Sequence, residues 1–194
     1  MNLALFDFDG TISTKDSTIE FTKYLKSKRD LLKGAIKLLP QIVLYKLNLY
    51  NDQALKESFI EYFFRGIDEE FFKSKAQDFS LNILPKLIRS VALDKINWHK
   101  TQKDRVIIIS ASFECILKPW CDKNNLELIA TKLEFINHIV TGKLLTKNCK
   151  GKEKVNRIKE LLDLNDYQLI YAYGDSRGDK EMLKLANKKF YKIF

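Results

Sequence analysis

The sequence predicts an α/β protein in which a doubly wound parallel sheet carries an inserted block of helices. Two observations lead to this prediction. Over residues 93–194, short β-branched apolar runs alternate with amphipathic helical patterns, as in parallel sheets that have helices on both faces. Residues 15–92 show only helical spacing of apolar side chains, and they separate the first apolar run from the others. We therefore expect an α/β core of residues 1–14 and 93–194, and an all-helical cap of residues 15–92.

The first expected strand starts at Leu3 and runs into the sequence Asp-Phe-Asp-Gly-Thr, which ends at Thr11. Side chains alternate along a strand, so Asp7 and Asp9 point the same way. Two acids this close repel each other unless a cation or a shared proton lies between them. Gly10 permits a tight turn that brings backbone N–H groups close to an anion. A nucleophile, a cation site and an anion-binding turn within five residues indicate phosphoryl chemistry.

The inserted block has the apolar spacing of amphipathic helices, as in Leu55, Phe59 and Phe63. The predicted helix boundaries there are N-caps at Asp52, Asp68 and Asp94 and a stop at Gly66. After the block we expect strands at 105–109, 127–135, 169–173 and 190–194, helices at 113–124, 151–162 and around 182–185, and a hairpin at 138–145 with its turn at Thr141-Gly142.

Polar residues follow three of the expected strands. Asp7 and Asp9 end the first, Ser110 and Ser112 follow the strand at 105–109, and Asp175 and Ser176 follow the strand at 169–173. In open parallel sheets, ligands bind beyond the carboxyl ends of the strands. We therefore predict one site that all three clusters share.

Composition limits the partners and the compartment. The 194 residues carry a formal charge of +9, but the lysines are dispersed and form no tail, so nucleic acid is not an expected partner. Three cysteines without paired metal spacing indicate neither a zinc site nor a disulfide framework. The apolar N-terminal run leaves no room for a cleavable signal, and no apolar run reaches spanning length. We expect a cytoplasmic protein, with peripheral contact at the inner face of a membrane left open.

Four segments together resemble the ordered motifs of the haloacid dehalogenase superfamily. They are Asp7-Phe-Asp-Gly-Thr11, Ser110-Ala-Ser112, a lysine near Gly151, and Gly174-Asp-Ser-Arg-Gly-Asp179. A helical insertion directly after the first motif is similar to the phosphoserine-phosphatase-like branch, subfamily IB. The resemblance implies a Rossmann-like core and an Mg²⁺-dependent phosphatase.

The resemblance also implies individual roles. Asp7 would be the nucleophile that forms an aspartyl-phosphate, and Asp9 would be the general acid and base. The carboxylate of Asp7, the backbone carbonyl of Asp9 and the carboxylate of Asp175 would hold Mg²⁺, which prefers oxygen ligands. Asp179 would support the metal's waters or orient the lysine; the alternative is an acid placed at a helix start.

The phosphoryl group would contact Gly10, Ser110, Ala111 and Lys154. For Ser110 and Ser112 the alternative is helix capping, which is compatible with phosphate binding. The subfamily pattern favours Lys154 as the motif lysine, whereas alignment to phosphoserine phosphatases favours Lys150; the other lysine would then be a surface charge.

The two histidines, His99 and His138, are expected to be structural, because the implied mechanism has no role for them.

Substrate choice is expected to lie in the cap. Residues 31–50 contain no acid, three lysines and a large apolar fraction. They are either packed cap helices or an interfacial segment that contacts phospholipid head groups, although Gly34 and Pro40 are expected to interrupt a long helix. The expected substrate is a small-molecule phosphomonoester. Alternatives are a lipid head-group phosphate such as phosphatidylglycerophosphate, transfer to an acceptor other than water, and a non-catalytic phosphate- or lipid-binding module. The oligomeric state is not predicted.

Overall fold

The computed structural model describes all 194 residues. Its centre is a five-stranded sheet with the strand order β3-β2-β1-β6-β7, and every neighbouring pair in it is parallel. The strands are β1 Leu3–Phe6, β2 Arg105–Phe113, β3 Glu127–Thr131, β6 Ile170–Gly174 and β7 Lys188–Tyr191. The chain runs outward from β1 in both directions, which confirms the doubly wound α/β fold.

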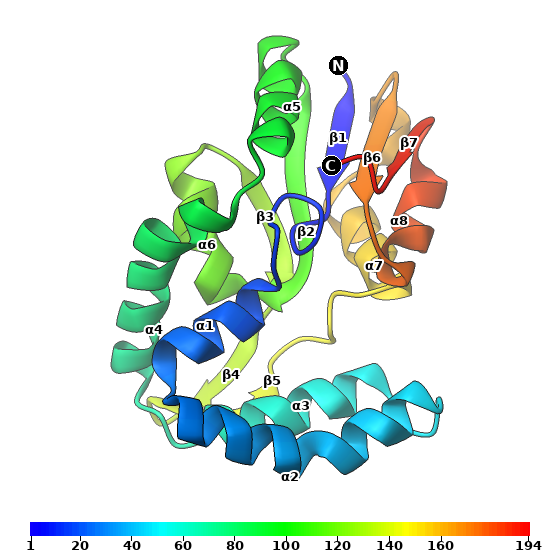
Figure 1. Ribbon diagram of the computed structural model, residues 1–194. Helices are drawn as coiled ribbons and strands as arrows, with labels where there is room; N and C mark the ends of the chain where they lie inside the picture. Colours follow the sequence, from blue (N-terminus) through cyan, green and yellow to red (C-terminus); the bar gives the residue numbers. More distant parts are fainter.

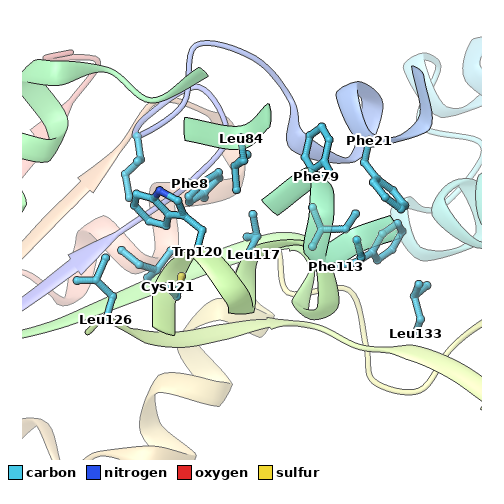
Figure 2. Close-up of a cluster of buried hydrophobic side chains, with 14 of the residues drawn as sticks. Phe8, Phe21, Phe79, Leu84, Phe113, Leu117, Trp120, Cys121, Leu126 and Leu133 are labelled. Carbon is cyan, nitrogen blue, oxygen red and sulfur yellow. The ribbon is translucent and has the colours of Figure 1, made fainter. Parts of the chain in front are cut away.

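The sheet has a hydrophobic core on each face, because side chains alternate along the buried strands. Leu3 and Leu5 of β1 pack with helices α7 (Lys152–Leu161) and α8 (Lys180–Leu185). Ala4 and Phe6 face the opposite core, which includes α5 (Ser90–Thr101) and α6 (Glu114–Lys123). Figure 2 shows part of this second core, where the ring of Phe8 packs against Trp120.

The chain between β1 and β2 is built of helices, as the sequence predicts. They are α1 Ser17–Leu25, α2 Lys28–Lys46, α3 Asp52–Phe63, α4 Glu69–Asp78 and α5, with short helical turns at Phe79–Ile83 and Leu84–Leu87. Figure 1 shows α1, α2 and α3 beyond the carboxyl end of the sheet, while α5 lies alongside it. Because α5 begins at Ser90, the predicted boundary at 92/93 falls inside a helix, and the division into two domains stays a prediction.

Residues 127–145 differ from their prediction. The expected strand at 127–135 is split into β3 and β4 (Leu133–Ile136), and β4 pairs with β5 (Ile139–Leu144) in a separate antiparallel sheet. The turn is at Asn137 and His138, which both have positive φ as a two-residue hairpin turn requires. Gly142 lies inside β5, where a Cβ would be 3.1 Å from the Cα of Glu61 on α3. The glycine therefore serves close packing, and its assignment to the turn was wrong.

Helix α2 is continuous, so the expected interruption at Gly34 and Pro40 is wrong. A Cβ on Gly34 would lie 2.2 Å from Cζ of Phe63, so the glycine allows α2 to approach α3 closely.

Most other boundaries shift by a few residues. The predicted cap at Asp68 is confirmed, but α3 is capped by Asn51 instead of Asp52, and Asp94 lies within α5. The last strand ends at Tyr191 and does not reach Phe194.

His99 is structural, as expected. Its Nδ1 lies 2.8 Å from Oδ2 of Asp104, and its Nε2 lies 2.8 Å from the hydroxyl of Tyr173. The ring is fully buried, where water cannot reach it, and these two contacts give each ring nitrogen a hydrogen-bonding partner. His138 is exposed in the hairpin turn.

None of the helices has the length and apolar content needed to cross a bilayer.

Candidate active site

The three predicted polar clusters meet at one edge of the sheet, because β2, β1 and β6 are neighbours. A cavity of about 470 Å³ opens there, and it is lined by residues of both the sheet side and the inserted helices. Of the predicted site residues, it is lined by Asp7, Asp9, Ser110, Ala111, Lys154 and Asp179. Gly10 and Asp175 do not line the cavity and lie beside it. The sequence therefore identified most of the polar residues on its sheet side.

Three carboxylates gather at the ends of β1 and β6. Asp7, Asp175 and Asp179 each offer an oxygen, and the three oxygens lie within 4.8 Å of one another. The pKa of Asp7 is raised to about 7, chiefly by burial; Lys154 opposes the shift, and Asp179 and Asp9 contribute to it. A cluster of carboxylate oxygens is the donor set that suits Mg²⁺, so these residues fit the predicted metal. Asp179 belongs to the cluster through its side chain, whereas Asp9 does not.

Lys154 is buried against two of these carboxylates. Its Nζ lies 2.5 Å from Oδ1 of Asp7 and 2.6 Å from Oδ1 of Asp179, and it donates to the carbonyl of Ile109 at 2.9 Å. Only 2% of the side chain is exposed. Burial would lower the pKa of Lys154, but Asp7 and Asp179 raise it above its ordinary value. The lysine is therefore a fixed positive charge at the base of the cavity.

Lys150 also lines the cavity, but it does not contact the Asp7 carboxylate. It is partly exposed and pairs with Asp52 on α3.

The Asp9 carboxylate is held by the start of the inserted helices. Its Oδ1 accepts the backbone N–H of Ser17 at 2.7 Å, and its Oδ2 accepts the hydroxyl of Ser112 at 2.6 Å. Desolvation raises the pKa of Asp9 to about 6. A carboxyl group with such a pKa can both give and take a proton near neutral pH.

Ser110 and Ser112 do not cap a helix. Both lie in β2, and α6 starts after Phe113 without a side-chain cap. Instead, the hydroxyl oxygen of Ser110 accepts the N–H of Ser112 at 3.0 Å. The capping alternative is wrong, because the strand continues beyond its predicted end at 109.

Gly10 brings the end of β1 against the loop after β6. Its φ is +84°, and a Cβ would lie 2.4 Å from Oδ2 of Asp175. Only glycine permits both the left-handed backbone and this approach. The close contact with Asp175 therefore explains why residue 10 is a glycine.

Several cavity residues come from the inserted helices and were missed. They include Asp16, Asp52 and Lys56, and Asn148 joins them from the loop before α7. The ammonium of Lys56 donates to the carbonyl of Ala111 and lies 4.8 Å from the centre of the Phe113 ring. Desolvation lowers the pKa of Lys56. The sequence contains one signal for it, since a lysine occupies a position that helical spacing assigns to the apolar stripe of Leu55 and Phe59.

Comparison with known proteins adds to this geometry. The family model for haloacid dehalogenase-like hydrolases matches residues 4–184. Protein CicA of Caulobacter vibrioides is 32% identical over 194 residues, which span 99% of this chain and 86% of CicA. A probable phosphatase of Mycobacterium tuberculosis is 29% identical over 93% of this chain and 65% of its own length. A substrate-bound phosphoserine phosphatase structure has a TM-score of 0.69 at 16% identity, covering 98% of this chain and 85% of the other, which shows a shared fold.

Proposed function

The chain belongs to the haloacid dehalogenase-like hydrolases, and we propose on that basis that it is an Mg²⁺-dependent phosphatase acting on a phosphomonoester through an aspartyl-phosphate. One observation carries the proposal. Asp7 lies at the base of the cavity, fixed by Lys154 on one side and gathered with Asp175 and Asp179 on the other. An anionic nucleophile needs positive charge beside it before it can approach an anionic phosphate; Lys154 supplies one, and a cation held by the three carboxylates would supply the rest.

In the proposed reaction, a carboxylate oxygen of Asp7 forms a bond to phosphorus while the bond from phosphorus to the leaving oxygen breaks. Lys154 holds Oδ1 of Asp7 in place. Asp9 gives its proton to the leaving oxygen, which departs as an alcohol. Asp9 then takes a proton from a water, whose oxygen bonds to phosphorus while the bond from phosphorus to the Asp7 oxygen breaks. Inorganic phosphate leaves, and both acids return to their starting states. The raised pKa of Asp9 supports this role, because the first step needs the protonated acid.

The metal site is proposed at the carboxylates of Asp7 and Asp175 and the backbone carbonyl of Asp9, with Asp179 orienting Lys154. When bound there, Mg²⁺ would neutralise charge on the nucleophile and the phosphate. The side chain of Asp179 also accepts the N–H groups of Asp175 and Ser176, so it holds the loop that presents Asp175.

Selectivity is proposed to come from the inserted helices. Their apolar contribution to the cavity is Ile19, Leu38, Ile42, Leu55 and Phe59, and their polar contribution includes Asp16 and Lys56. A leaving group with both apolar and polar parts fits these walls. The same residues would serve transfer to an acceptor other than water, which differs only in what the cavity admits.

The test is release of phosphate from p-nitrophenyl phosphate and from a panel of phosphomonoesters, with Mg²⁺ and with EDTA. We expect turnover that EDTA and Asp7→Asn abolish. Asp166→Asn is the matched control, because Asp166 is exposed and does not line the cavity. If no ester is turned over faster than by the Asp7→Asn variant, the phosphatase proposal fails and a binding module replaces it.

A further inference from the structure

Helix α2 has an apolar stripe that no part of the chain covers. Leu32, Ile36, Leu39, Val43 and Leu47 follow one another at spacings of four and three residues, so they share one side of the helix. Each is between 46% and 66% exposed. We call this set the outer face of α2. In Figure 1, α2 runs along the edge of the molecule with α3 beside it.

The opposite side of the same helix faces the protein. Gly34 and Leu38 are buried, and Leu38 and Ile42 line the cavity. An α-helix with its side chains is about 10 Å across. The outer face therefore lies one helix diameter from the wall of the candidate active site.

Basic residues border the outer face on both sides. By helical spacing, Lys33 and Lys37 lie along one border, and Lys28 and Lys46 lie along the other. Asp30 is the only acidic residue of α2. An apolar stripe bordered by lysines is complementary to the anionic surface of a lipid bilayer, which takes up the apolar side chains and attracts the ammonium groups.

We propose that α2 docks on anionic membranes through its outer face, lying in the plane of the interface. A second copy of the chain is a poorer occupant, because a two-fold contact through α2 would bring the lysine borders of both copies together. The continuous helix through Gly34 and Pro40 gives the stripe from Leu32 to Leu47 an unbroken length of about 22 Å. Docking would place the cavity next to the lipid head groups. It does not depend on the proposed phosphatase activity, so the two can fail separately.

The experiment is sedimentation of the full chain with vesicles. One set is phosphatidylcholine alone, and the other contains phosphatidylglycerol at about one part in three, close to an anionic leaflet. We expect binding to the anionic vesicles that weakens as salt is raised, because added ions screen the lysines. The double variant Ile36→Glu with Val43→Glu should reduce binding about tenfold or more. Its control is Val91→Glu with Leu161→Glu, which changes two similarly exposed apolar side chains on α5 and α7.

A second pair separates charge from apolar contact. Lys33→Gln with Lys37→Gln should weaken binding to anionic vesicles about tenfold, whereas Lys123→Gln with Lys159→Gln should change it little. Circular dichroism of each variant checks that it is folded. The proposal is overturned if the unmodified chain does not sediment with anionic vesicles, or if Ile36→Glu with Val43→Glu binds equally well. It is also overturned if the chain self-associates without vesicles and these two substitutions make it monomeric.

Discussion

The ammonium of Lys150 lies 2.5 Å from Oδ1 of Asp52, so an ion pair joins the loop before α7 to the first turn of α3. The amide of Asn148 donates to the other oxygen of Asp52, and Lys150 also donates to the hydroxyl of Tyr45 on α2 at 3.0 Å. Asp52, Asn148 and Lys150 line the cavity. Lys150 is therefore an exposed charge, as expected for the lysine other than Lys154, and it also forms an ion pair at the wall of the cavity.

The first prediction concerns this ion pair between Lys150, on the sheet side of the cavity, and Asp52, on the inserted helix α3. Asp52→Asn should raise KM for a phosphomonoester and increase proteolysis of residues 28–63, because α2 and α3 lose their charged contact with the loop. Stability should change by less than about 1 kcal/mol, since the pair is partly exposed and screened by water. Steady-state kinetics and limited proteolysis are the measurements. The control is Asp122→Asn, which breaks the exposed ion pair with Lys118 on α6. An equal KM in both variants would show that the pair between Lys150 and Asp52 does not position α2 and α3 for substrate binding.

The second prediction concerns the buried lysine. Lys154→Met should destabilise the fold by about 3–5 kcal/mol, because Asp7 and Asp179 lose the cation that balances them. Phosphate release should be lost as well. Urea unfolding followed by circular dichroism measures the first effect, with Lys150→Met as the matched control. An unchanged unfolding midpoint would show that Lys154 does not balance the two carboxylates.

The third prediction concerns the metal. Calorimetric titration should detect Mg²⁺ binding to the chain, and Asp175→Asn should weaken it about tenfold or more, because one anionic oxygen is removed. Asp166→Asn should bind Mg²⁺ like the unmodified chain. Equal affinity in Asp175→Asn would exclude Asp175 as a ligand.

The fourth prediction concerns pH. Burial lowers the pKa of His99 below its usual value, against the opposing effect of Asp104. In the unfolded chain the ring takes up a proton below about pH 6.5. The folded ring takes it up only at lower pH, so the free energy of unfolding should fall as pH falls through this range. The slope from this group is at most about 1.4 kcal/mol per pH unit.

The measurement is urea unfolding at several pH values between neutral and mildly acidic, for the unmodified chain and for His99→Gln. Glutamine keeps an amide in the buried position but does not titrate, so its slope should be smaller. His138→Gln is the control, because His138 is exposed. If the free energy of unfolding depends on pH with the same slope in His99→Gln and in the unmodified chain, His99 is not the group responsible for the fall in stability.

Much of the fold followed from local patterns. Parallel strands and amphipathic helices have distinct apolar spacing, and the motifs at Asp7 and Asp175 directly follow the ends of β1 and β6, whereas Ser110 lies inside β2. The superfamily and the doubly wound fold are confirmed. The role of each residue, the Mg²⁺ dependence, the aspartyl-phosphate and a cytoplasmic location stay predictions.

The errors arose where distant segments decide a residue's role. Gly34 and Gly142 looked like a helix breaker and a turn, yet both allow close contact with α3. Lys56 belongs to no sequence motif, because its place at the cavity depends on a contact with Ala111, which is far away in the chain. Local propensity cannot report such contacts, which depend on how the inserted helices pack.

The central place of β1 has a consequence for synthesis on the ribosome. Leu3 pairs with Arg105 on one side and with Ile170 on the other. About one hundred further residues must therefore be synthesised before the first strand can pair with any neighbour. At roughly 5–20 residues per second, that wait is about 5–20 s. During it, an apolar strand with two open edges is a hazard for aggregation. Asp7 and Asp175 come together only when β6 has emerged, so a nascent chain that stops earlier cannot assemble the carboxylate cluster.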